Sequence, residues 1–101
     1  MKADIDRIAV ISTAHITPDD NVLFSKRNMT YPITAFHYEG GIVLPFLSTE
    51  VLTARQRTEV LDWGFSHSVV EIIMWAHQHR FAGVRLDRDG PVVSELTAYN
   101  W

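Results

Sequence analysis

The sequence predicts a single α+β domain over residues 1–101, with a small mixed or antiparallel sheet and helices packed mainly on one face. The length of 101 residues is typical of one domain with one hydrophobic core. Short apolar segments of strand length alternate with longer segments that begin at helix-capping residues. Their order contains a β-α-β-β-α-β frame, which predicts a ferredoxin-like sheet with an extra helix and a C-terminal hairpin.

The first predicted unit is a strand that leads into a capped helix. Residues 5–13 carry apolar side chains on both alternating faces, which is typical of a central strand. Thr17 is suited to cap the following helix, Pro18 fits its first position, and two aspartates follow where the helix dipole favours anions. We expect this helix to end near Asn28.

An antiparallel hairpin is predicted next. Segments 33–39 and 42–46 flank Gly40-Gly41, a dipeptide suited to a two-residue hairpin turn. The predicted cross-strand pairs are Tyr38 with Val43 and His37 with Leu44. Both faces of the sheet would then carry apolar side chains. If the helices cover only one face, the other face favours dimerisation.

Residues 48–63 predict the second helix. Ser48 and Thr53 are alternative N-caps, and Thr53 with Gln56 three residues later has the spacing of a capping box. We expect Gly64 to end the helix because glycine readily adopts the left-handed conformation found after helix C-termini.

The third predicted helix begins after Ser66 and extends to about Arg80. Its middle is apolar on most sides and is interrupted only by Glu71. Such a helix is buried on more than one side, either between the sheet and the second helix or at a subunit contact. The first interpretation is favoured. Gly83 is expected to stop this helix.

The C-terminal part predicts a short strand over 84–87 and a turn over 88–91. Val92 and Val93 are expected to return as a hairpin partner. The last residues, 96–101, are apolar and aromatic, so we expect them to dock on the body of the domain.

Composition narrows the functional classes. A net charge of −3 gives no electrostatic reason to expect nucleic acid as a partner. The lack of cysteine excludes disulfides, thiolate metal sites and cysteine nucleophiles. No secretory signal, apolar run of membrane-spanning length or cofactor motif is present, so we expect a cytoplasmic protein with no membrane partner and no cofactor.

The junction of the first strand and helix is the candidate ligand site. Ser12, Thr13, His15 and Thr17 bring hydroxyls, an imidazole and free helix N–H groups together, which is a combination suited to an anion or phosphate. The alternative, which is favoured, is that Thr17 only caps the helix and His15 hydrogen-bonds locally.

No metal site is expected despite five histidines. His77 and His79 are two positions apart and point to opposite sides of a helix. His67 and Glu71 share a helix face but have no evident third ligand. Asp89 in LDRDGP is better explained by a hairpin turn than by a calcium loop.

Two functional hypotheses remain open. The leading one is a small non-enzymatic protein-binding module of inhibitor, adaptor or regulatory type, for which a homodimer is one open oligomeric state. Tyr99, Trp101 and Trp75 are its candidate contact residues, since Trp and Tyr are favoured at interfaces, although core filling is the simpler explanation for Trp75. The alternative is a phosphate-ester or nucleotide-processing enzyme in which Asp87 orients His15, provided that the first and last strands are neighbours.

Two short motifs, STAHIT near the start and LDRDGP followed by L-x-x-Y-N-W at the end, resemble an uncharacterised family of short bacterial proteins. The family is known only as a domain of unknown function carried on plasmids and other mobile elements. The resemblance implies no catalytic residue. It implies an accessory protein of a mobile element, acting in regulation or against host defence.

Overall fold

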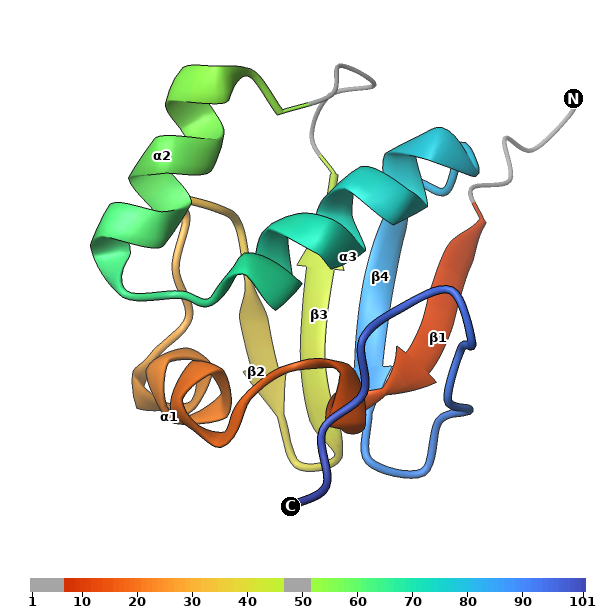
Figure 1. Cartoon of the computed structure of the whole chain (residues 1–101). Helices are drawn as coiled ribbons and strands as arrows, with labels where there is room; N and C mark the ends of the chain where they lie inside the picture. Colours follow the sequence, from red (N-terminus) through yellow and green to blue (C-terminus); the bar gives the residue numbers. More distant parts are fainter. Residues whose placement is uncertain (1–6, 47–51) are drawn as a thin grey trace, which may run out of the picture.

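Four strands form one mixed sheet, and three α-helices cover one of its faces (Figure 1). The computed structural model describes residues 7–46 and 52–101. The elements are β1 (Ile8–Ser12), the 3₁₀ turn η1 (Thr13–His15), α1 (Pro18–Lys26), β2 (Phe36–Tyr38), β3 (Gly41–Pro45), α2 (Ala54–Trp63), α3 (His67–Gln78) and β4 (Gly83–Asp87). The α+β class is confirmed, and the order of the elements is compatible with the ferredoxin-like frame.

The strand order is β1-β4-β3-β2, with β1 parallel to β4 and the other pairs antiparallel. The predicted central position of the first strand is therefore wrong, because β1 lies at an edge. Ala9 and Ile11 are buried beneath the helical layer, whereas Ile8 and Val10 are exposed on the other face. Apolar residues on both sides of β1 thus reflect an uncovered apolar face rather than burial on both sides.

The hairpin of β2 and β3 is present, but its register differs from the predicted one by two residues. Phe36 lies opposite Val43, and Tyr38 lies opposite Gly41. The turn consists of residues 39–40, and Gly41 is the first residue of β3. A Cβ atom at Gly41 would lie 1.8 Å from the carbonyl oxygen of Leu86 on β4. This glycine therefore permits close approach of two strands instead of forming the turn.

The predicted starts of the three helices agree with the structure. Thr17 caps α1, Ser66 caps α3, and Thr53 forms a capping box with Gln56 at the start of α2. Ser48, the alternative cap for the second helix, lies outside the described residues. Gly64 ends α2 in the left-handed conformation, with φ of 117°.

The end of α3 differs from the prediction. The helix stops at Gln78, and Arg80 takes a positive φ of 61° just after it. Gly83 is instead the first residue of β4, where an added Cβ would lie 2.8 Å from the carbonyl oxygen of Leu44. As at Gly41, the glycine is required by the packing of neighbouring strands.

The predicted C-terminal hairpin is also wrong, because Val92 and Val93 add no strand to the sheet. The residues after the turn at 88–90 form an irregular segment on the same face of the sheet as the helices (Figure 1). This C-terminal strap, residues 91–101, first runs along the outer side of β1, where the Ser12 N–H donates to the Pro91 carbonyl, and then crosses over the sheet beside α3 (Figure 1). The prediction that the tail docks on the body is thus confirmed.

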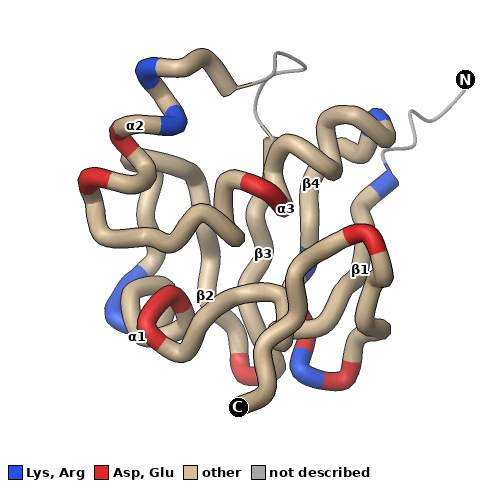
Figure 2. The backbone as a smooth tube through the Cα atoms, in the orientation of Figure 1, with Lys and Arg blue, Asp and Glu red and all other residues tan. Residues whose placement is uncertain are grey.

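The core lies between the sheet and the helices, and α3 is its principal helical element. The most deeply buried apolar side chains include Ile11, Ile16, Phe24, Leu44, Val69, Ile72 and Leu86. Charged residues of both signs are interspersed over α1, α2 and the turns (Figure 2). Within the residues that the structure describes, no helix has the length and apolar character needed to cross a membrane.

Candidate functional site

His15 is completely buried at the junction between β1 and α1. Its Nδ1 lies 2.7 Å from the carbonyl oxygen of Thr97, and its Nε2 lies 2.8 Å from the backbone nitrogen of Val93. Because the Val93 N–H donates to Nε2, the hydrogen of a neutral ring belongs on Nδ1, where it donates to Thr97. Both ring nitrogens therefore bind the C-terminal strap.

The N-terminus of α1 already holds a carboxylate of this chain. Asp20 is fully buried and accepts hydrogen bonds from the Thr17 N–H at 3.0 Å and from the Ser66 N–H at 2.8 Å. The Ser66 hydroxyl donates to the same carboxylate at 2.5 Å. Asp20 thus joins the starts of α1 and α3 and occupies the position that an external anion would take.

The hydroxyls of the predicted anion site take part in local capping. Ser12 Oγ accepts from the Ala14 N–H at 3.0 Å, and Thr17 Oγ1 accepts from the Asp20 N–H at 3.0 Å. Thr13 belongs to η1, and its carbonyl oxygen accepts from the Ile16 N–H. The structure brings Ser12, Thr13, His15 and Thr17 into one turn, and the hydrogen bonds of Ser12, His15 and Thr17 all lead to groups of the chain itself.

Asp87 lies on the strand next to β1, as the alternative enzyme hypothesis required, but its carboxylate does not meet His15. It accepts from the Tyr38 hydroxyl at 2.9 Å and from the Asp89 N–H at 2.8 Å. The Asp89 N–H bond and the Tyr38 hydroxyl hold the pKa of Asp87 below its usual value. Partial burial and the bond to Asp87 raise the pKa of Tyr38. The structure therefore pairs Asp87 with Tyr38.

The C-terminal strap is held by side chains from distant parts of the chain. Glu71 of α3 accepts from the Thr97 N–H at 2.9 Å. Glu95 of the strap accepts from the Trp75 indole N–H at 3.1 Å and lies 3.2 Å from His79 Nε2. Leu96 is buried in the core. The strap is thus fixed along most of its length.

The predicted aromatic contact residues also engage the body of the domain. The Tyr99 N–H donates to the Ala14 carbonyl at 2.7 Å, and its hydroxyl makes a short hydrogen bond with Ser68. The Trp101 indole N–H donates to the Ile16 carbonyl at 3.0 Å, yet 55% of this residue stays exposed. Of the aromatic residues proposed for partner contact, Trp101 therefore presents the largest free surface.

Besides the junction around His15, the structure offers a second candidate site, the outer edge of β1, which faces away from β4. The Ser12 N–H points away from β4 and donates to the Pro91 carbonyl at 2.8 Å. Since backbone groups alternate along a strand, the N–H and C=O groups of Ile8 and Val10 point to the same outer side. None of the described residues bonds to these groups of Ile8 and Val10.

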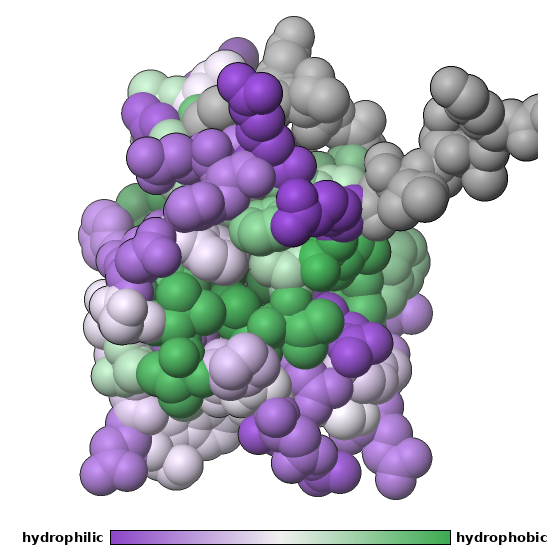
Figure 3. Space-filling model, turned by 90° about the vertical axis from the view of Figure 1, so that its right-hand side faces the viewer, coloured by the Kyte–Doolittle hydropathy of each residue, from purple (hydrophilic) through white to green (hydrophobic). Residues whose placement is uncertain are grey.

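Apolar side chains surround this edge. Ile8 is 48% exposed, Val10 37% and Val92 62%. Seen from the β1 side, apolar residues run across the middle of the surface with hydrophilic residues above and below them (Figure 3). On the face that the helices leave uncovered, the cross-strand partners of Val10 are, in order across the sheet, Arg85, Val43 and Phe36. Apolar side chains thus continue across this face on either side of Arg85.

Among the described residues, no three His, Asp or Glu side chains converge in a way that could hold a metal ion. His67, His77 and His79 lie on or next to α3, and the His77 ring stacks on Phe46 with a centroid distance of 4.2 Å. Burial lowers the pKa of His77. The arrangement around His77 is that of an uncharged ring in an apolar wall.

Sequence reasoning missed the parts played by Asp20, Glu71 and the β1 edge. Asp20 stands at the third helical position after Thr17, which is the capping-box position, so a local signal was present. Glu71 is the one charged residue of α3, and a lone charge in an apolar helix indicates a specific partner. The β1 edge had no local signal, because it depends on strand order.

The comparisons with known proteins agree with an uncharacterised family. Residues 8–101 match the C-terminal domain of a family of unknown function, DUF5983. No curated protein and no solved structure matches the chain. The match covers the sheet, the helices and the strap, so nearly all described elements belong to the family domain. The chain therefore belongs to the DUF5983 C-terminal domain family, whose function is unknown.

Proposed function

We propose that this protein is a non-enzymatic protein-binding module that takes up an extended segment of its partner along the outer edge of β1. The observation that carries the proposal is the edge itself. Ile8 and Val10 present backbone N–H and C=O groups with no partner among the described residues, next to exposed apolar side chains. Added strands use such groups for affinity and neighbouring side chains for specificity.

The two edges of the sheet support this assignment because they differ. At the β2 edge, the His37 N–H donates to Asn28 Oδ1 at 2.8 Å, and Ala35 bridges to Met29. Proteins usually protect an exposed edge with charges, prolines or such coverings. The β1 segment, IAVIS, contains no charge and no proline, so its edge is left suited to pairing.

The buried polar groups of the junction favour binding over catalysis. His15 and Asp20, the two fully buried ionisable side chains there, bond only to groups of this chain. An enzyme that used His15 would first have to release the strap. The resemblance to proteins of mobile elements extends the proposal: the partner would be a host protein, and the module would act in regulation or against host defence in the cytoplasm.

Affinity capture from a bacterial host lysate tests the proposal. Val10→Lys places a charge on the edge and should abolish capture of a partner that binds there. Val22→Lys is the matched control, since Val22 is an exposed valine on α1, which lies next to β2 at the opposite edge of the sheet (Figure 1). A captured protein should be lost with the first variant and kept with the second.

Hydrogen exchange of the resulting complex then locates the contact. The amides of Ile8 and Val10 should exchange rapidly in the free protein and become protected in the complex. The amides of Ala9 and Ile11 point toward β4 and serve as internal references. Equal capture by both lysine variants, or a complex in which the Ile8 and Val10 amides still exchange rapidly, would contradict binding by strand addition.

A further inference from the structure

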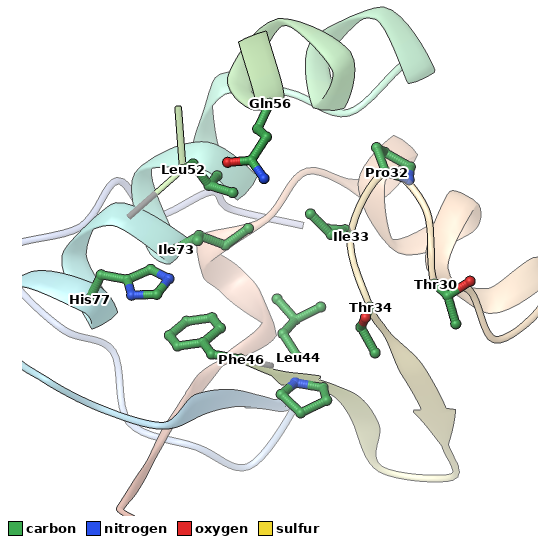
Figure 4. Close-up of a pocket in the computed structure, with 11 residues that line it drawn as sticks. Thr30, Pro32, Ile33, Thr34, Leu44, Phe46, Leu52, Gln56, Ile73 and His77 are labelled. Carbon is green, nitrogen blue, oxygen red and sulfur yellow. The ribbon is translucent and has the colours of Figure 1, made fainter. Parts of the chain in front are cut away.

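A pocket of about 240 Å³ lies on the helical side of the sheet (Figure 4), and none of its described lining residues belongs to β1 or to the turn that holds His15. Its walls come from α2, α3, the end of β3 and the loop at residues 30–34. Residues 47–51, which connect the lining residues Phe46 and Leu52, lie outside the described part of the chain. The pocket is therefore defined by residues on either side of that segment.

The walls combine aliphatic and aromatic side chains with the polar side chains of Thr30, Thr34 and Gln56, and the described lining residues include no Asp, Glu, Lys or Arg. Ile33, Leu44 and Ile73 form buried surface, and the Phe46 and His77 rings stack with an interplanar angle of 10°. Because burial lowers the pKa of His77, its ring is uncharged near neutral pH. The described lining residues offer a charged ligand no countercharge in exchange for the hydration it gives up, so they favour an uncharged one.

Gln56 supplies a directed hydrogen-bond donor at the rim. Its Oε1 accepts from the Thr53 N–H at 2.8 Å, as part of the cap of α2. This bond fixes which end of the amide is oxygen, since a nitrogen there could not accept. The Gln56 side chain points into the pocket with its amide nitrogen toward the interior (Figure 4). Gln56 is exposed, so an acceptor oxygen or ring nitrogen of a ligand would replace water at this donor.

The size of the space limits the ligand. A volume of 240 Å³ equals that of about eight water molecules in the liquid, which is below the usual range of drug-sized sites. We infer that the pocket binds a small uncharged aromatic or heteroaromatic molecule of about eight to ten non-hydrogen atoms with a carbonyl or ring-nitrogen acceptor. The acceptor bonds to Gln56, and the ring lies against the apolar and aromatic wall. This site is separate from the proposed partner edge.

Titration of the isotopically labelled full chain with benzamide, followed by NMR, tests the inference. Benzamide should shift the signals of Phe46, Ile73, His77 and the Gln56 side-chain amide, with a dissociation constant on the order of 1 mM or lower. Benzoate has nearly the same shape but carries a charge, so it should bind at least about tenfold more weakly.

The variant Gln56→Glu isolates the donor. A glutamate can still accept from the Thr53 N–H and preserve the cap, but it cannot donate to the ligand. It should weaken benzamide binding about tenfold, whereas Gln78→Glu, the same change at an exposed position at the end of α3, should leave it unchanged. The inference is overturned if benzamide shifts none of the lining signals in the unmodified chain, or if benzoate binds equally well.

Discussion

The two ends of β1 differ in how completely their polar groups are used. At the C-terminal end, the Ser12 N–H, both nitrogens of His15 and the Asp20 carboxylate all bond within the chain. At the N-terminal end, the outward backbone groups of Ile8 and Val10 have no partner among the described residues. Polar residues in a sequence attract functional interpretation, yet here the polar end bonds within the chain, and the apolar end is the one that we propose for binding.

The largest effect on stability is expected at the C-terminal end of β1, which we call the closed end because its polar groups bond within the chain. The substitution there is Asp20→Ala. The change leaves two backbone N–H groups and the Ser66 hydroxyl without their buried acceptor, which should lower the free energy of unfolding by about 3 kcal/mol. Asp19→Ala, in the same turn but exposed, should cost less than about 1 kcal/mol. Urea unfolding of both variants measures the difference, and similar losses would show that Asp20 is not the link between the helices.

A smaller loss is expected for His15→Ala, because it affects one contact region of the strap. The Val93 N–H and the Thr97 carbonyl would lose their partner, at a cost of about 2 kcal/mol. Exchange of the Val93 amide should accelerate in this variant. His37→Ala, which removes an exposed ring, should change stability by less than about 0.5 kcal/mol. If Val93 remains protected in His15→Ala, the imidazole does not hold the strap.

The helix starts could be predicted from sequence because capping is local. Thr17, Thr53 and Ser66 each bond to groups within three residues. The strand order could not be predicted, because it depends on pairings between distant segments, and Gly41 and Gly83 were assigned to turn and helix termination although they serve strand packing. A glycine required for close approach looks the same in sequence as one required for a turn.

The candidate site shows the same difference between what local sequence predicts and what depends on distant segments. His15 was identified from sequence as a residue to inspect, but its partners Val93 and Thr97 are 78 and 82 positions away. Val92 and Val93 have strand-like side chains, yet the His15 ring takes the Val93 N–H that a strand partner would need. The identity of the residue was local information, whereas its role was determined by a distant segment without regular structure.

Asp87, on the face of the sheet that the helices leave uncovered, should make folding stability depend on pH. The Asp89 N–H and the Tyr38 hydroxyl lower its folded-state pKa, so its contribution to stability is present above the unfolded value, about 3.9, and is lost as the pH falls through the folded value. Arg85 and Arg88 act in the same direction. Asp87→Asn should therefore flatten the acid side of the stability profile. Asp62→Asn, at an exposed aspartate with no hydrogen bond or ion pair among the described residues, should leave the profile unchanged.

The smallest effect on stability is expected for Val10→Lys, at the open end of β1, where the outward backbone groups of Ile8 and Val10 lie. Val10 is 37% exposed, and its side chain lies on the face that the helices do not cover, so a lysine can keep its charge in water. Its outward backbone groups have no partner in the described part of the chain, with or without the substitution. The free energy of unfolding should change by no more than about 0.5 kcal/mol.

This small value bears directly on function. A small loss would mean that Val10 adds little to folding, which agrees with the proposed role of this exposed apolar side chain in partner contact. The measurement is urea unfolding of Val10→Lys beside Val22→Lys. A loss well above 1 kcal/mol for Val10→Lys alone would mean that the open end of β1 is structural after all. The contrast with the closed end would then disappear, and loss of a partner in the capture experiment would reflect unfolding rather than a blocked edge.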